Sequence, residues 1–187
     1  RAEDLGGGVG LLELRALHRN SADEIAAYLK AFAKKRVGKV VLDLRGLDGG
    51  PLPAAIAAAR LFLDKERVIC RTTARDPAYR MTARARAGAP FAQRPRLRVL
   101  VDRGTAASAE VLAAALQQNG RALLVGEPTR GKIDIQRSYP LADGSQLRLT
   151  VAYFQPPLGG TLLDHGLTPD LPVAAGADAL QAAKRGF

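Results

Sequence analysis

The stretch from Gly104 to Gln136 constrains this chain more than any other part of the sequence. GTAASAEVLAAALQQNG joins a turn of small residues to a helix start, and the strand RALLV and the glycine loop GEPTRGK follow it. A helix N-terminus presents unpaired backbone N–H groups and the positive end of the macrodipole, which stabilise a developing anion. A lysine in a glycine loop near such a helix start is a candidate proton acceptor.

This layout predicts a serine/lysine hydrolase, in which a hydroxyl at the helix start attacks and a neutral lysine takes its proton. Such a mechanism needs no histidine. His18 and His165 form no triad with a nearby serine and acid, and we interpret both as surface or turn residues.

The composition predicts one globular domain that extends over residues 1–187. With 47% hydrophobic residues, 187 residues are enough for one sizeable core. The net charge of +10 would suit nucleic acid, but only 5% of the residues are aromatic and no zinc-ligand or stacking motif accompanies the basic residues. We therefore interpret the charge as a surface property and expect no nucleic-acid partner.

The single cysteine and the apolar runs narrow the class further. Cys70 lies in an apolar strand, so we predict a buried thiol, no intrachain disulfide, no metal and no cofactor. No apolar run approaches the roughly 20 residues of a membrane span, and Arg1 begins no charged-then-apolar signal pattern.

Strands and helices alternate along the sequence, which predicts a parallel-rich α/β layer. A capping box at Ser21–Glu24 starts a helix that Gly38 ends. The Asp143-Gly144 pair predicts an antiparallel hairpin. We expect strands at 9–14, 40–44, 68–72, 97–101, 122–125, 133–139 and 146–154, and further helices at 53–63, 105–118 and 178–184.

Residues 73–95 differ from their surroundings because they carry five arginines against the single acid Asp76. Hydrophobic periodicity is weak there, which predicts a mobile, solvated basic loop between two strands. An acidic partner or a phospholipid surface is the alternative reading of this charge.

Three segments together resemble the carboxy-terminal processing proteases, also called tail-specific proteases. DLRGLDGG, GTAASAEVLAAALQQNGRALLVGEPTRGK and HGLTPDLPV have the order and spacing of that family. The resemblance implies a crotonase-like or Clp-protease-like core of repeated ββα units with an antiparallel hairpin near the C-terminus. It also implies a serine endopeptidase that cleaves proteins near their C-terminal tails. Such proteases commonly carry a PDZ domain, and this sequence has no segment of that type.

The resemblance assigns the site residues one by one. The nucleophile position, three residues before Glu110, is Ala107, and the general base is Lys132, where 132 − 107 = 25 is the family spacing. Gln136 is expected to orient the lysine amine, on the same strand face as Lys132 because an even offset keeps the side. The Ile133–Ile135 alternation suggests a sheltered mouth around the lysine.

The expected oxyanion hole uses backbone amides of Gly49 or Gly50 and of Ser108. Two residues depart from the family pattern. Asp48 stands where a proline is usual, and Ile133 stands where a second glycine is common.

Alanine at the nucleophile position leaves three explanations. A deliberate Ser-to-Ala change is favoured, because alanine forfeits a helix cap worth about 1 kcal/mol while the other site residues are retained. A natural pseudoprotease that binds peptides or another ligand is the second. The third is attack by Ser108, although one step along a helix turns a side chain by about 100°.

The resemblance implies partners and a location for the longer protein. We expect protein or peptide substrates with exposed C-termini, with an adaptor protein, a membrane surface and an oligomer as further partners that the family allows. It places the protein in the periplasm or cell envelope of a bacterium. A basic nucleic-acid module ranks last, since it rests on charge alone and requires strongly salt-dependent binding.

Overall fold

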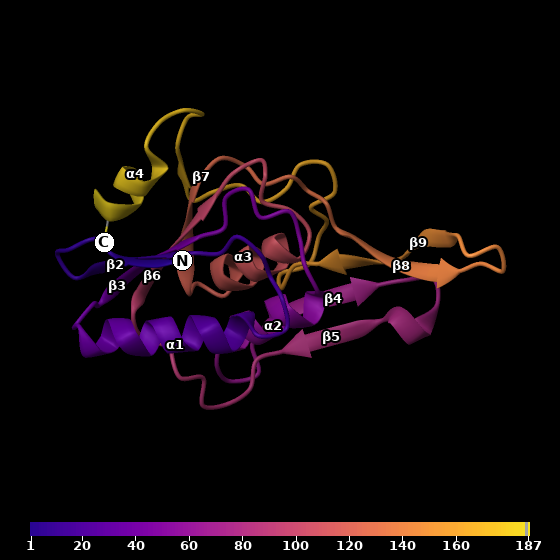
Figure 1. Ribbon diagram of the computed structural model, residues 1–187, viewed down its shortest axis with the longest axis horizontal. Coiled ribbons are helices and arrows are strands. Elements are labelled where there is room, and N and C mark those ends of the chain that lie inside the picture. The colour runs from indigo at the N-terminus through magenta and orange to yellow at the C-terminus, as the bar shows by residue number, and fades with distance from the viewer. Residues whose placement is uncertain (186) are drawn as a thin grey trace.

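The computed structural model describes residues 1–185 and 187, and it contains two β-sheets with helix α3 between them (Figure 1). The larger sheet has the order β1-β2-β3-β6-β7-β10, and its neighbours are parallel except for β1 with β2. Its strands are β1 (Ala2–Asp4), β2 (Val9–Glu13), β3 (Lys39–Asp43), β6 (Arg96–Val101), β7 (Ala122–Gly126) and β10 (Leu171–Pro172).

The smaller sheet is antiparallel and has the order β5-β4-β9-β8. Its strands are β4 (Val68–Thr73), β5 (Met81–Arg84), β8 (Asp134–Pro140) and β9 (Gln146–Gln155). The β8–β9 hairpin projects from the body of the molecule (Figure 1). The helices are α1 (Ser21–Lys34), α2 (Leu52–Arg60), α3 (Ser108–Gln118), α4 (Ala179–Arg185) and the short η1 (Pro77–Tyr79).

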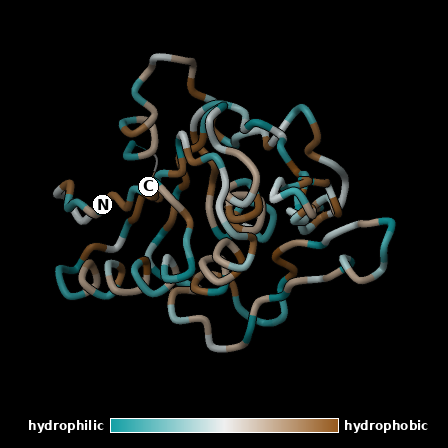
Figure 2. The backbone as a smooth tube through the Cα atoms, turned by 45° about the vertical axis from the view of Figure 1, so that its right-hand side comes forward, coloured by the Kyte–Doolittle hydropathy of each residue, from teal (hydrophilic) through white to brown (hydrophobic). Residues whose placement is uncertain are grey.

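The central strands β3, β6 and β7 of the larger sheet are largely buried on both faces because they are mainly apolar. In β3, Val40 and Leu42 face the main core with α1, α2 and α3, whereas Val41 faces the opposite side. On that side Val41 joins residues of β6, β7 and α4 in a second, smaller cluster. In Figure 2 the hydrophobic segments, coloured brown, accordingly gather in the middle of the molecule.

Helix α3 occupies the centre of the domain. Its residues from Ser108 to Leu116 are all buried, and it packs against α2, β4 and β7. Alanines make up much of this helix, and their small side chains let it approach neighbours on several sides. The two sheets and their helices confirm the predicted α/β class, and β8 and β9 form the predicted antiparallel hairpin near the C-terminus.

The predicted end signals of the first helix were wrong. Asn20 is the N-cap of α1 and has no side-chain cap, while the Ser21 hydroxyl accepts a hydrogen bond from the His18 N–H at 2.9 Å. At the other end the helix stops at Lys34, and Arg36 adopts the left-handed conformation with φ 59°. Gly38 therefore does not end the helix.

The predicted mobile loop at 73–95 was also wrong in part. Strand β5 lies within it and pairs with β4. Two arginines are held by backbone carbonyls, since Arg80 Nε donates to Ala74 O at 2.8 Å and Arg84 Nη1 donates to Glu66 O at 3.0 Å. These bonds to the chain's own backbone explain how a segment with little hydrophobic periodicity becomes ordered.

No described helix is long and apolar enough to cross a membrane.

Candidate active site

Three loops meet where the parallel strands β3, β6 and β7 end. We name them the glycine turn (residues 44–51), the elbow (residues 102–108) and the lysine loop (residues 127–133). The carboxyl ends of parallel strands share one edge of a sheet, where ligands of α/β proteins commonly bind. The Ala106 N–H donates to Leu47 O at 3.0 Å, and Asp48 forms a parallel bridge with Ala106. The glycine turn and the elbow are therefore fixed to each other.

Asp102 holds the same two loops together through its side chain. Its Oδ1 accepts the N–H groups of Gly46 and Gly104 at 2.9 Å and that of Thr105 at 3.0 Å. The Thr105 hydroxyl in turn donates to Leu44 O at 2.9 Å. Sequence reasoning missed this residue, although an aspartate directly after a strand and before a glycine is a known turn signal.

Ala107 has an unusual backbone conformation at the end of the elbow. Its φ is 51° and its ψ is −121°, directly before the first residue of α3. A non-glycine residue held in such a sparsely populated region costs on the order of 1–3 kcal/mol and often marks a functional site. The surrounding hydrogen bonds hold this strained residue at the start of a helix.

The same conformation corrects the capping argument. An N-cap residue normally has extended dihedral angles, from which its side chain accepts an N–H of the first turn. The Ala107 φ is positive instead, and the Glu110 N–H is already satisfied by the Ala107 carbonyl at 2.9 Å. The argument from a lost serine cap therefore does not support a deliberate Ser-to-Ala change. Helix α3 also begins at Ser108 rather than at Thr105 because the elbow occupies the preceding residues.

Glu110 connects the elbow to the lysine loop. Its Oε2 accepts the N–H of Ala107 at 3.0 Å and that of Lys132 at 2.9 Å, and its Oε1 accepts the N–H of Gly131 at 2.7 Å and the Thr129 hydroxyl at 2.5 Å. The residue is completely buried. Burial raises the pKa of its carboxyl, and these four hydrogen bonds partly offset that effect.

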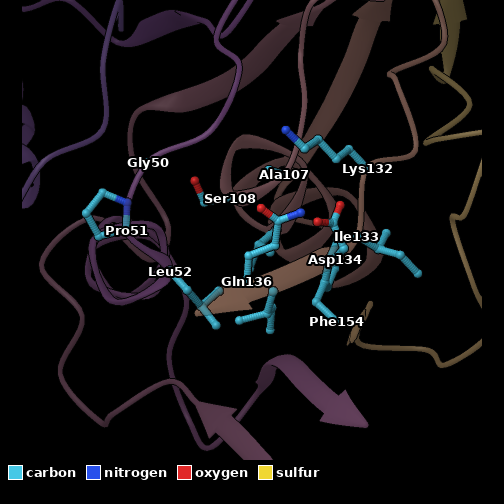
Figure 3. Close-up of a pocket in the computed structure, with 12 residues that line it drawn as sticks. Gly50, Pro51, Leu52, Ala107, Ser108, Lys132, Ile133, Asp134, Gln136 and Phe154 are labelled. Atoms are coloured by element: carbon cyan, nitrogen blue, oxygen red, sulfur yellow. The ribbon is translucent and has the colours of Figure 1, made fainter. Parts of the chain in front are cut away.

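A pocket of about 240 Å³ opens beside Ala107 (Figure 3). The structure brings Gly50, Ala107, Ser108, Lys132 and Gln136 together in its lining. The rest of its wall is mainly apolar and comes from Pro51, Leu52, Val111, Ile133, Ile135 and Phe154, with Asp134 as a further polar member.

Gly49 is not part of that lining, but it lies next to the elbow. A Cβ added at Gly49 would lie 3.6 Å from the Ala107 Cβ. Both glycines have positive φ, 105° at Gly49 and 127° at Gly50. The turn conformation is therefore one that other residues rarely adopt.

Lys132 is more open than the sequence predicted. Its side chain is 45% exposed, so the expectation of a sheltered mouth was wrong. Its Nζ lies 3.9 Å from Asp48 Oδ1, and Arg130 Nη1 lies 3.5 Å from Asp48 Oδ2. The two cations of the lysine loop thus share one carboxylate of the glycine turn.

Gln136 shares the pocket with Lys132, but the strand geometry differs from the predicted one. Lys132 precedes β8, and a bulge lies between Ile135 and Gln136. The even offset therefore does not place the two side chains on one face of a regular strand. Residues 132 to 136 all line the same pocket, which the alternating sides of a regular strand would not allow.

Two other predicted features have clear positions. The Ser108 hydroxyl is buried and has no hydrogen-bond partner among the described residues. Cys70 is buried, as predicted, and burial raises the pKa of its thiol to about 11. Within residues 1–185 and 187, no group of three or more His, Cys, Asp or Glu side chains is arranged to hold a metal ion.

The chain belongs to peptidase family S41, which matches residues 8–173. A carboxyl-terminal-processing protease of Picosynechococcus sp. is 40% identical over 168 residues, which cover 90% of this chain and 40% of that protein. Carboxyl-terminal-processing peptidase 2 of the Arabidopsis thaliana chloroplast is 35% identical over 165 residues, or 88% of this chain and 32% of that protein.

The solved structures agree with the sequence relatives. The photosystem II D1 C-terminal processing protease has a TM-score of 0.81 and 31% identity, and the match covers 95% of this chain and 46% of that one. The chain thus spans less than half the length of each of these relatives. The predicted family is confirmed. The sequence relatives come from bacteria and from chloroplasts.

Proposed function

We propose that this chain is the peptidase core of a carboxy-terminal processing protease of the Ser/Lys type, with alanine at the nucleophile position. The supporting observation is the backbone of Ala107, a strained residue at the first turn of a helix, on the wall of a pocket that Lys132 also lines. The side chain at position 107 extends from a turn that Glu110 holds in place by accepting the Ala107 backbone N–H. A serine there has the setting of an activated nucleophile.

The other roles follow from the same pocket. Lys132 takes the proton of the nucleophile, and Gln136 orients the lysine amine. The oxyanion is stabilised by backbone N–H groups of the glycine turn and of Ser108, which is the first residue of α3 and so has no intrahelical acceptor for its N–H. The apolar wall beside Ala107 suits an apolar substrate side chain.

The substrate class and location of the longer protein are part of this proposal. We infer protein substrates with exposed C-terminal tails from the names of the relatives. We also propose a bacterial periplasm or cell envelope as the compartment. An adaptor, a membrane surface and an oligomeric parent protein stay predictions. The unmodified chain does not cleave peptides, because alanine has no oxygen with which to form an acyl-enzyme.

The test uses Ala107→Ser with an unstructured protein substrate. We expect the chain itself to give no turnover and Ala107→Ser to raise the rate by on the order of 10³-fold or more. Ala107→Ser combined with Lys132→Ala should return to the background. Equal rates for the single and double variants would refute the dyad. Turnover by the unmodified chain that Ser108→Ala abolishes would make Ser108 the nucleophile.

A natural pseudoprotease is the second candidate, and the position of Asp48 favours it. The Asp48 carboxylate forms an ion pair with the Lys132 amine, the group that catalysis requires. The codon at position 107 of the source gene separates the candidates. A serine codon supports an altered enzyme, whereas an alanine codon supports a binding module that retains the pocket.

A further inference from the structure

Three hydrogen-bond donors at the start of α3 have no acceptor in the described part of the chain. One is the Ser108 hydroxyl, which is buried in a residue that is only 5% exposed. The other two are the backbone N–H groups of Gly50 and Ser108, to which residues 1–185 and 187 offer no described acceptor. Buried polar groups normally have partners, because an unpaired one costs free energy. The unpaired hydroxyl therefore points to a ligand.

These donors lie on one wall of the pocket. Gly50, Ala107 and Ser108 all line it, and the bridge between Asp48 and Ala106 fixes the glycine turn beside the elbow. In the view of Figure 3 the Ser108 oxygen lies between Gly50 and Ala107. The hydroxyl hydrogen is free to rotate toward a bound oxygen. Helix α3 has 11 residues, and the positive end of its dipole adds to the attraction for an anion.

The charged groups around the pocket decide where an anion is accepted. Asp48 lies between Lys132 at 3.9 Å and Arg130 at 3.5 Å, so its charge is balanced locally. Glu110 is occupied by four donors. Asp134 lines the pocket from β8 and disfavours an anion on that side. The start of α3 is thus the favoured place, and its neutral N–H and O–H donors attract an anion whatever the charge on Lys132.

The shape and lining of the pocket indicate which anion fits. A carboxylate has two oxygens that accept several hydrogen bonds, whereas the carbonyl of an internal peptide bond has one oxygen. The pocket of about 240 Å³ has a mainly apolar wall, in which Val111, Ile133 and Phe154 are buried. A peptide that ends in an apolar residue offers both parts, a carboxylate for the donors and a side chain for the wall.

We propose that the chain, with alanine at position 107, binds peptides through the α-carboxylate of an apolar last residue. The Ser108 hydroxyl and the backbone N–H groups of Ser108 and Gly50 bind the carboxylate, and the apolar wall holds the last side chain. This activity goes beyond cleavage because no bond is formed or broken. It rests on the proposed function only in taking the pocket as one that receives peptides.

The first experiment compares three hexapeptides, labelled with a fluorophore at the N-terminus, by fluorescence anisotropy. The first ends in valine with a free carboxylate, and the second is its C-terminal amide. The third is an amide that carries one aspartate near its N-terminus, which gives it the charge of the first. We expect the free carboxylate to bind at least tenfold more tightly than either amide. Equal affinities of the first and third peptides would mean that the net charge of +10 attracts any anion, and would overturn the inference.

The second experiment removes the hydroxyl. Ser108→Ala should weaken binding of the free carboxylate by about ten- to a hundredfold, the range of a hydrogen bond to a charged group, and leave the amide peptide unchanged. Ser138→Ala is the matched control, because Ser138 is an exposed serine of β8 that does not line the pocket. It should leave all affinities unchanged. An equal loss in both variants, or no loss in Ser108→Ala, would contradict the assignment.

Thermal unfolding separates a binding role of the hydroxyl from a structural one. Because the hydroxyl has no described partner in the free chain, Ser108→Ala should unfold at the same temperature as the parent chain or higher. The variant should also lose most of the increase in unfolding temperature that the free-carboxylate peptide produces in the parent. A lower unfolding temperature of the peptide-free variant would indicate a structural role of the hydroxyl and would overturn the inference.

The last side chain of the peptide tests the apolar wall. Asparagine in place of the final valine should weaken binding about tenfold or more, because the wall then buries a polar group. Equal binding would contradict the placement of the ligand in this pocket. These outcomes are distinct from failure of the proposed function. If Ala107→Ser does not cleave, the peptidase is refuted and the binding comparisons stand, whereas absence of a carboxylate preference overturns this inference alone.

Discussion

Ala107 and Lys132 donate their backbone N–H groups to the same oxygen, Oε2 of Glu110, at 3.0 and 2.9 Å. The nucleophile position and the proposed base lie 25 residues apart in sequence, and one buried carboxylate sets the relative position of their backbones. Because Gly131 and Thr129 bind the other oxygen, the lysine loop cannot shift without breaking several bonds of Glu110.

Glu110→Ala should destabilise the domain strongly, because it leaves three N–H groups and one hydroxyl without their acceptor. We expect a loss of roughly 3 kcal/mol or more in the free energy of unfolding, and a loss of roughly 1–3 kcal/mol for Glu110→Gln. Urea titration followed by circular dichroism measures both. Glu127→Gln is the matched control and should change stability by less than about 0.5 kcal/mol. Similar values for the two glutamates would argue against this role of Glu110.

Gly50→Ala should cost more stability than Gly49→Ala. A Cβ at Gly50 would lie 2.6 Å from the Leu17 carbonyl oxygen, whereas a Cβ at Gly49 meets only the Ala107 Cβ at 3.6 Å. Both positions have positive φ, so both substitutions are strained by about 1 kcal/mol, and the collision adds about 1–2 kcal/mol at Gly50. Thermal unfolding of the two variants tests the order, and a larger loss at Gly49 would contradict it.

Cys70 should make the domain less stable at alkaline pH. Burial raises the pKa of the native thiol to about 11 from 9.0, so the unfolded thiol loses its proton first as the pH rises above 9. Deprotonation then favours the unfolded state, and the penalty reaches about 2 kcal/mol near pH 10.5. The stability difference between the chain and Cys70→Ala should therefore shift in favour of the alanine variant from pH 8 to 10.5. A difference that is constant with pH would show that the thiol does not contribute.

Gln136→Ala in the Ala107→Ser background should weaken catalysis without abolishing it. An orienting residue exchanges no proton, so its loss misplaces the amine and lowers kcat by roughly ten- to a hundredfold. Lys132→Ala should remove activity down to the background. Steady-state kinetics on one substrate compare the two, and an equal loss in both variants would mean that Gln136 does more than orient the lysine.

The Ala107→Ser variant of this chain should be a poorly organised enzyme when it is compared with the longer parent protein that carries the same substitution. The glycine turn has positive φ at both glycines, and its amides must be held where the oxyanion forms. One carboxy-terminally tagged substrate, assayed with both proteins, gives the rate and the tail preference. Equal rates and equal preference would show that the core needs no outside organiser.

The sequence was sufficient for the features that depend on local pattern. Alternating apolar strands and helices predicted the parallel layer, and the Asp143-Gly144 pair predicted the turn between β8 and β9. The short strands β1 and β5 escaped prediction because three or four residues carry too little periodicity. The end signals of α1 failed because Ser21 has a nearby donor, His18, that a local rule does not include.

For the site, the sequence determined which residues are present, and their spacing along the family pattern predicted Ala107, Lys132 and Gln136 as members. Only the tertiary structure decided how they are held. Glu110 and Asp102 act through hydrogen bonds to loops distant in sequence, and the Asp48–Lys132 pair joins the loops that follow β3 and β7. Local pattern records the conformational preference of each segment. The exposure of Lys132 and the charge beside it depend on which loops the parallel sheet brings to the same edge, and that arrangement exists only in the folded chain.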